Sequence, residues 1–377
     1  MSARPTTVLC LCLERYHWML IPGYAAAFRR QGIEFFCAGD DVPPDAQLED
    51  FLRLCPERPS CVLHFESGHP VLPLGLERSE IPTVCFQVDT HAFTHRRIRW
   101  SSLFDHVAVS HPGFDKIFQQ AGHPGAFLLP QAARGEFFAG PELTREYEIG
   151  WVGRTSGSLY RRRAEWFPRL VSSFHTNDWS RSYTLEEVAG VYRRSRVVVN
   201  IGRDDAPHEC NLRVFEVLAS GALLLTSAPT ELTALGFEEG VHFAAYRHES
   251  EIIPLVRHFL QNEDERTRIA NAGREKALRE HTYDCRVEQL LRRLEEAGNR
   301  KIAPARSWPE VRVRLMYLDF FAGHDLLDCA AAQFQHIAGR GIRETISGAA
   351  LLARAWVRRW TRRARTLLKR VAWFRTD

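Results

Sequence analysis

Residues 197–226 read VVVNIGRDDAPHECNLRVFEVLASGALLLT, and this stretch predicts the fold of the chain. Its first five residues have the length and composition of a buried strand. Residues 211–220 then have the length of a short helix that Gly221 stops, and residues 222–226 form a second apolar run. A strand, a crossover helix and a second strand build a parallel sheet, whose ligand site lies at the carboxyl ends of the strands.

The polar loop 202–210 lies at that end of the predicted sheet and leads into the helix. A helix N-terminus attracts anions because its first N–H groups have no partner within the helix. Glu216, one turn further in, is poorly placed for a phosphate but well placed to accept hydrogen bonds from a ribose diol. Phosphate and ribose together indicate a nucleotide.

The segment 211–226 resembles the donor-binding signature of GT-B glycosyltransferases, in the branch of the spore-maturation glycosyltransferase-like proteins. Further segments in the order of that family extend the resemblance over residues 60–295: 81–91, with an Asp-Thr-His element, 148–154 and 274–291. The resemblance implies two Rossmann-like domains and the transfer of a sugar from a nucleoside diphosphate sugar to an acceptor hydroxyl.

Retaining members of the GT-B class often carry two glutamates at a fixed spacing, one near the donor sugar and one on the ribose. If Glu216 is the ribose-side residue, the sugar-side position falls on His208, and Glu209 comes one residue late. The resemblance therefore supports the role of Glu216 and leaves the sugar-side group open between His208 and Glu209.

Length and composition agree with a two-domain globular protein. The chain has 377 residues, of which 45% are hydrophobic and 25% charged. Its nine cysteines include no C-x-x-C pair, which favours a reduced cytoplasm. We expect no signal peptide and no membrane-spanning helix, because no run reaches the roughly 18 apolar residues that a span requires. The expected location is the cytoplasm, or the inner face of the membrane for a peripheral protein.

Strands that alternate with helices predict an α/β fold with two doubly wound sheets. We expect a Rossmann-like acceptor-side domain over residues 1–135 and a Rossmann-like nucleotide-sugar-binding domain over residues 143–298. Residues 130–135 have the composition of a linker between the two. A helical extension, residues 299–377, completes the chain.

The negative charge that grows on a leaving diphosphate must be stabilised, and without a metal this falls to cationic side chains and backbone N–H groups. Arginine suits phosphate because its planar fork can bind two oxygens. The predicted donor-binding residues are Gly153, Arg154, Tyr160, Arg162, Asn211, Leu212, Arg213 and Glu216. For residues 161–163 a solvated helix face is the alternative. Asp204, Asp205 and His208 could act as metal ligands, but one short loop rarely completes a metal site. We therefore expect no metal, and we also expect no cofactor.

Asp89 and His91 follow a predicted strand of the N-terminal domain and are its catalytic candidates. Side chains at the end of such a strand can position or deprotonate an acceptor hydroxyl. The alternative is structural, since Asp and Thr are common helix N-caps and a neighbouring His often satisfies a buried polar group.

Residues 349–377 carry eight Arg and one Lys against one Asp, a net charge of +8, whereas the whole chain has +4. At helical spacing the apolar residues form one stripe: Leu352, Trp356, Trp360, Ala364, Leu367, Val371 and Phe374. A basic helix with tryptophans on its apolar face suits an anionic membrane surface. The first alternative is that the helix docks onto the enzyme's own domains or onto a partner protein. The second is that it binds nucleic acid, which we do not expect.

The resemblance thus implies a retaining, metal-independent glycosyltransferase of the hexosyltransferase type, acting in the synthesis of a cell-surface polysaccharide or glycoconjugate. Its partners are a nucleotide-sugar donor and an acceptor that the sequence does not identify. Two alternatives stay open. The first is a nucleotide-sugar epimerase, which needs acid and base groups but no acceptor. The second is a catalytically silent scaffold of the same fold, which needs no catalytic groups and no acceptor.

Overall fold

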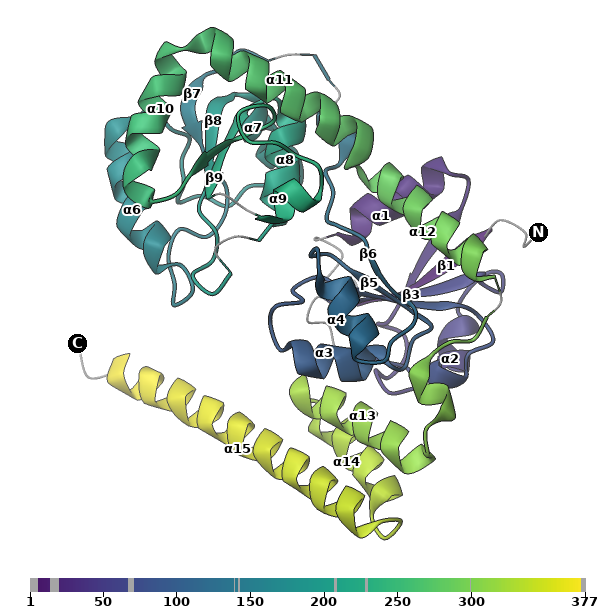
Figure 1. The fold of residues 1–377 in the computed structure, drawn as a ribbon. Coiled ribbons are helices and arrows are strands. Elements are labelled where there is room, and N and C mark those ends of the chain that lie inside the picture. Colours follow the sequence, from purple (N-terminus) through teal and green to yellow (C-terminus); the bar gives the residue numbers. More distant parts are fainter. Residues whose placement is uncertain are drawn as a thin grey trace. The chain divides into compact units, whose positions relative to one another are not determined.

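The computed structural model describes residues 6–13, 20–66, 71–138, 140–141, 143–206, 209–227, 230–298 and 300–373, with side chains as far as residue 362 (Figure 1). The chain divides into two compact units. The first comprises Met1–Val109, Phe114–Phe127 and Leu294–Asp377, and the second Ser110–Gly113 and Leu128–Arg293.

The first unit contains a six-stranded sheet in the order β2-β1-β3-β4-β5-β6, and its pairs from β2 to β5 are parallel. This order reverses direction beside β1, as in flavodoxin-like doubly wound folds. Its strands, helices and short 3-10 turns are β1 (Thr7–Leu11), α1 (Ile21–Arg30), β2 (Glu34–Ala38), α2 (Leu48–Leu52), β3 (Cys61–Glu66), η2 (Leu76–Arg78), β4 (Thr83–Gln87), α3 (Thr94–Ser101), β5 (His106–Val109), α4 (Phe114–Gln120) and β6 (Ala126–Leu128).

The second unit contains a four-stranded parallel sheet in the order β10-β9-β8-β7. Its elements are α5 (Gly135–Phe138), β7 (Tyr147–Gly150), α6 (Arg161–Ser173), α7 (Leu185–Arg193), β8 (Ser195–Asn200), α8 (Leu212–Ser220), β9 (Leu223–Ser227), α9 (Thr230–Ala234), β10 (Ala244–Tyr246), η3 (Glu249–Glu251), α10 (Ile252–Gln261), α11 (Glu263–Glu280) and α12 (Tyr283–Ala297), which runs on into the first unit. Gly221 ends α8 in the left-handed conformation, as the sequence predicts.

The chain after α12 packs on the first unit. It contains η4 (Pro304–Ser307), α13 (Glu310–Gly323), α14 (Leu327–Ile337) and α15 (Ile342–Trp373). Leu318 and Phe321 of α13 are fully buried in the same core as Leu9 and Val62 of the sheet. Asp319, which is buried, pairs with Arg96 of α3 at 3.0 Å. The described part of this segment therefore belongs to the first unit, because residues between Ala305 and Ala355 share its core.

The predicted stripe of the last helix divides between two surfaces. Leu352 packs against the core of the first unit, whereas Trp356 is 57% and Trp360 is 73% exposed. The side chains of Ala364, Leu367 and Val371, and the whole of Phe374, lie outside the described residues. Of the helices that the structure describes, none is long and apolar enough to span a membrane.

Candidate functional site

Two arginines, Arg163 buried and Arg213 partly buried, meet at the carboxyl end of β7. Trp151, which directly follows the strand, is fully buried. The guanidinium carbon of Arg213 lies 3.8 Å from the centre of the indole ring of Trp151. The guanidinium carbon of Arg163 lies 4.9 Å from that indole. Burial, followed by the charge of Arg213, lowers the pKa of Arg163 to about 9. Neither arginine forms an ion pair with an acidic side chain in the part of the chain that the structure describes, so both guanidinium groups can interact with an added anion.

Arg213 connects the loop after β7 to the start of α8. Its Nε and Nη2 donate to the carbonyl of Val152 at 3.2 and 2.9 Å, and its Nη1 donates to Oδ1 of Asn200 at 3.0 Å. Gly153 has a φ of +137°, and a Cβ at this position would lie 2.5 Å from Nη2 of Arg213. The glycine therefore allows the guanidinium to lie against the backbone.

Replacing Gly153 by alanine should displace Arg213 and lower turnover by about tenfold or more, since a small misplacement of a positioned group is costly. Gly157→Ala is the matched control, because Gly157 has a similar φ of +133° but its Cβ would meet only Cδ2 of Tyr160, at 3.4 Å. Both substitutions carry a backbone strain of about 1–3 kcal/mol. Steady-state kinetics and urea denaturation of the two variants separate loss of turnover from loss of stability. Equal turnover in both would contradict the positioning role.

Arg154 stands apart from the other arginines of the site. Its side chain is exposed, and within the described residues it makes no hydrogen bond or ion pair; only its carbonyl is engaged, by Nη1 of Arg163 at 3.1 Å. A guanidinium group that lies at the carboxyl end of a strand and makes no bond to the protein is available to a phosphate group.

Arg162 differs from Arg154 because its charge is already matched. It binds Asp204 through Nε at 3.3 Å, Glu249 through Nη1 at 3.0 Å, and the carbonyl of Arg203 through Nη2 at 2.9 Å. These contacts hold the loop after β8 against α6 and η3. The neighbouring Tyr160 lies with its ring 4.3 Å from the guanidinium carbon of Arg163. Arg163, rather than Arg162, therefore points into the site.

The start of α8 lies beside the arginines. Asn211 precedes the helix, and its Nδ2 lies 3.4 Å from Oδ1 of Asn200. The Oδ1 of Asn211 is buried without a hydrogen-bond partner among the described residues. Leu212 is the first helical residue, and the N–H groups of such a first turn have no acceptor within the helix. This end of α8 can therefore bind an anion.

Glu216 lies one turn further along α8. Its side chain is largely buried, and it forms no hydrogen bond or ion pair with any described residue. Burial raises the pKa of this carboxyl from 4.5 to about 7, against the lowering effect of Arg213 and Arg134. A buried carboxyl without a protein partner costs stability, and such groups cluster at binding and catalytic sites.

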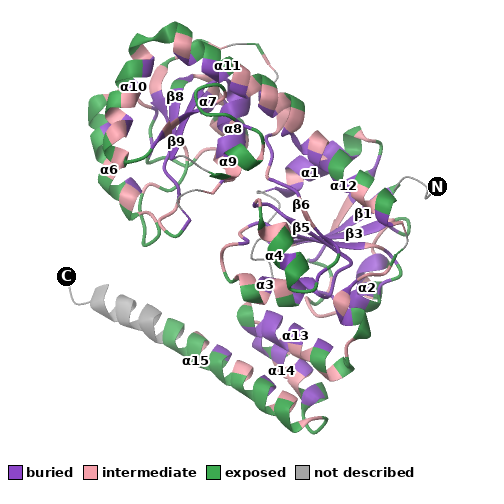
Figure 2. Ribbon diagram, viewed as in Figure 1, coloured by how far each residue is buried: buried purple, intermediate pink, exposed green. Residues whose placement is uncertain are grey.

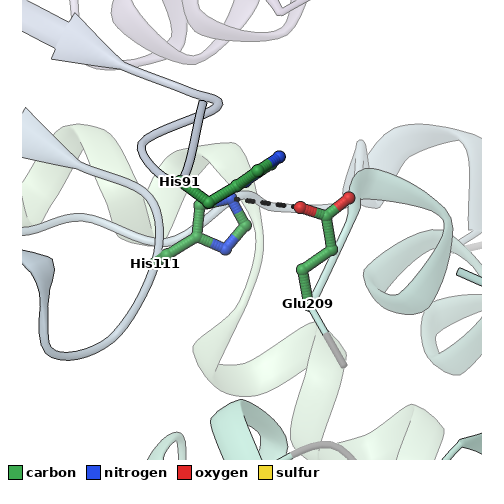
Figure 3. Close-up of side chains that lie close together, drawn as sticks. All are labelled: His91, His111 and Glu209. Carbon is green, nitrogen blue, oxygen red and sulfur yellow. Dashed lines mark ion pairs between the residues drawn. The ribbon is translucent and has the colours of Figure 1, made fainter. Parts of the chain in front are cut away.

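A histidine that sequence reasoning missed lies near the loop before α8. His111 is buried, and its Nδ1 lies 3.1 Å from both carboxylate oxygens of Glu231 on α9. The same carboxylate accepts the backbone N–H of Cys210 at 2.6 Å. Figure 3 shows that the other nitrogen of His111 faces Glu209, whose nearest oxygen is 3.9 Å away. His208, the other sugar-side candidate, lies outside the described residues.

Asp89 and His91 lie on the turn after β4 in the first unit. Both are half-buried, and the N–H of Ala92 donates to the carbonyl of Asp89 at 3.0 Å. The turn is held in place by Arg97, whose Nε donates to the carbonyl of Ala92 at 2.6 Å and whose Nη1 pairs with Glu66 at the end of β3. Both catalytic candidates therefore lie at the carboxyl edge of their sheet, where ligands of such folds bind.

The second unit is similar to a known protein family. A family model described as glycosyl transferase-like matches residues 149–292. No curated protein matches the sequence. Among solved structures, HepE of Anabaena in complex with UDP and glucose is 9% identical, with a TM-score of 0.54 over 77% of this chain and 100% of that chain.

Two further solved structures are similar. A glycosyltransferase of Rickettsia africae is 8% identical, with a TM-score of 0.56 over 78% of this chain and 99% of that one. Sucrose-phosphate synthase of Thermosynechococcus elongatus is 12% identical, with a TM-score of 0.51 over 78% and 100%. At these identities the likeness shows the fold. Together with the family match, it confirms the predicted GT-B fold and the prediction that the chain is an enzyme of the glycosyltransferase class.

Proposed function

We propose that this protein transfers a sugar from a nucleoside diphosphate sugar to an acceptor hydroxyl, with retention of configuration and without a metal. The observation that carries the proposal is the accumulation of positive charge at the carboxyl end of β7. Arg163 is buried and Arg213 is partly buried there, and neither has an acidic ion-pair partner among the described residues. A diphosphate supplies the missing negative charge.

The neighbouring groups match the rest of a nucleotide. The first turn of α8 offers N–H groups to a phosphate, and Glu216, as a carboxylate, accepts hydrogen bonds from the ribose diol. A donor with a uridine base is the first choice, because the similar Anabaena HepE was crystallised with UDP and glucose. Arg154, which has no partner for its side chain among the described residues, stabilises the charge on the departing diphosphate.

The loop before α8 supplies the sugar-side groups in this proposal. Glu231 fixes the orientation of His111, and Glu209 lies beside the other ring nitrogen. Asp89 and His91 bind the acceptor in the first unit. In a retaining reaction the leaving phosphate takes the proton of the acceptor hydroxyl, so no protein nucleophile is required.

The spore-maturation branch is the proposed affiliation within the GT-B class, on the strength of the segments 81–91, 148–154 and 211–226. A peripheral location at the inner face of the membrane is proposed with it. The acceptor is then a precursor of a cell-surface polysaccharide or glycoconjugate, which presents its hydroxyl at that face.

Calorimetry with UDP and with uridine tests the donor site directly. We expect UDP to bind at least tenfold more tightly than uridine, since hydrogen bonds between charged groups contribute about 1.5–3 kcal/mol each. Incubation with UDP-glucose should release UDP in the presence of EDTA, and proton NMR of the transferred or released sugar should show the retained anomer. Absence of any nucleotide binding would favour a silent scaffold, and conversion of the sugar without an acceptor would favour an epimerase.

A further inference from the structure

Helix α15 carries two apolar faces. Ala355 is buried, and Leu351 and Leu352 pack with it against the core of the first unit. A second face, which we call the apolar stripe, consists of Ile342, Ile346, Ala349, Ala353, Trp356, Val357 and Trp360. Spacings of three and four residues place these side chains along one side of the helix.

The apolar stripe is uncovered within the described residues (Figure 2). Its large members are exposed to between 57% and 84%. The described part of the chain has ten exposed large apolar side chains, and five of them are Ile342, Ile346, Trp356, Val357 and Trp360. The stripe extends over about 27 Å at 1.5 Å per residue. Large continuous apolar patches on a protein surface mark sites of interaction with another protein or with a membrane.

A basic groove adjoins this helix. It has a volume of about 570 Å³ and lies between α3, α13 and α15, all of the first unit. Its basic members are His95, Arg96, Arg99, Arg354 and Arg358. Asp319 is its acidic member and is shared between Arg96 and Arg99, at 3.0 and 2.9 Å. The groove therefore keeps an excess of positive charge.

The groove and the stripe share two residues, Ala353 and Val357, so the positive charge lies directly beside the apolar surface. The sequence extends this charge, because residues 345–376 contain no Asp or Glu and residues 349–377 have a net charge of +8. Exposed tryptophans, aliphatic side chains and an adjoining positively charged groove match one kind of partner, a bilayer with anionic lipid. The phosphate backbone of a nucleic acid would leave the apolar stripe in water.

We propose that α15 lies in the interface of an anionic membrane, with the apolar stripe among the acyl chains and the basic groove on a lipid phosphate. This surface belongs to the first unit, whereas the proposed donor site belongs to the second. A substitution that abolishes membrane attachment should therefore leave nucleotide binding unchanged, and a substitution in the donor site should leave membrane attachment unchanged.

Flotation with vesicles of phosphatidylcholine, with and without about 30% phosphatidylglycerol, tests the proposal on the full chain. We expect binding to the anionic vesicles alone, and weaker binding at high salt. Trp356→Ser combined with Trp360→Ser should lower binding at least tenfold. Ile117→Ser is the matched control, since Ile117 is 41% exposed on α4 of the same unit. UDP affinity should be unchanged in both.

The groove is tested by Arg354→Glu, because Arg354 is exposed and has no ion pair among the described residues. Each basic side chain near an anionic surface strengthens binding about fivefold, so this charge reversal should weaken flotation by that factor or more. Arg53→Glu, at an exposed position of the same unit, should leave it unchanged. Free inorganic phosphate at millimolar concentration should compete weakly if the groove binds lipid phosphate.

Three results would overturn the proposal. The first is equal binding to neutral and anionic vesicles, or to neither. The second is a stable dimer in sedimentation analysis that the tryptophan variant converts to a monomer, since a second copy would then cover the stripe. The third is tight binding of RNA or DNA that the tryptophan variant retains, because that binding would use the charge alone.

Discussion

Glu216→Gln should make the protein more stable without ligand and weaken its hold on UDP. The carboxyl of Glu216 is largely buried and has no protein partner among the described residues, and its pKa is raised from 4.5 to about 7. Glutamine fills the same space without a charge. In the binding site, however, it offers one acceptor oxygen in place of a carboxylate, so UDP affinity should fall at least tenfold.

The stability effect has a defined pH window. Near pH 4 the carboxyl is protonated in the folded and the unfolded chain, and the variant and the wild type should be equally stable. As pH rises from 4.5 to about 7 the unfolded chain loses this proton first, so the wild type loses stability. Above pH 7 the difference is complete, and the shift corresponds to about 3 kcal/mol at most. Urea denaturation at pH 5 and pH 8 measures it.

Glu186→Gln on α7 is the control, because Glu186 is an exposed carboxylate of the same unit. It should change neither stability nor affinity. UDP binding of the wild type should also strengthen between pH 6 and pH 8, as the acceptor carboxylate ionises. The phosphate of the ligand titrates near pH 6 as well. The pH dependence that Glu216→Gln removes therefore reports the carboxyl alone, and unchanged UDP affinity in the variant would remove Glu216 from the site.

The sequence predicts well those parts of the fold that depend on local pattern. The strand at residues 197–201, the helix after Asn211, its stop at Gly221 and the strand after it all occur within one or two residues of the predicted bounds. Each is encoded by an apolar run or by a residue with special backbone freedom. The two α/β sheets follow from the alternation of such elements.

The sequence predicts poorly which of several adjacent side chains enters the site. Arg161, Arg162 and Arg163 lie on consecutive positions of α6, and the rotation of the helix decides between them. Trp151 and Phe167 set that rotation, with their rings 4.6 Å apart, so Arg163 is buried while Arg162 meets two carboxylates. Local periodicity carries no information about that contact.

Two other features depend on contacts between distant residues. His111 acquires its carboxylate partner from Glu231, 120 residues later in the chain, and no motif links the two. On α15 the sequence shows one apolar stripe, but the helix buries Leu352 against α13 and α14 and leaves Trp356 exposed. A helix that is apolar on two sides does not reveal which side its own protein covers.

Arg154→Ala should lower turnover by about a hundredfold or more while leaving the fold and the binding of uridine nearly unchanged. Removing one preorganised donor from a site where negative charge develops costs about that much in kcat. The exposed side chain of Arg154 makes no hydrogen bond or ion pair among the described residues, so urea denaturation of the variant should match the wild type.

Arg161→Ala is the matched control for this prediction. Arg161 is seven residues away, its side chain is 84% exposed, and it lies 3.6 Å from Asp204. An exposed ion pair of this kind contributes little, so the control should keep wild-type turnover. Arg154→Lys should recover part of the rate, because lysine restores the charge but not the two-pronged geometry.

The comparison of kcat with binding identifies the step at which Arg154 acts. A group that holds the donor equally in its ground and transition states would raise KM and leave kcat unchanged when removed. Removal of a group that stabilises the departing diphosphate lowers kcat, because the charge that this group meets grows only as the glycosidic bond breaks. If Arg154→Ala and Arg161→Ala turn over at the same rate, the free guanidinium after β7 is not part of the chemistry, and the stabilising charge comes from Arg163, Arg213 and the first turn of α8 alone.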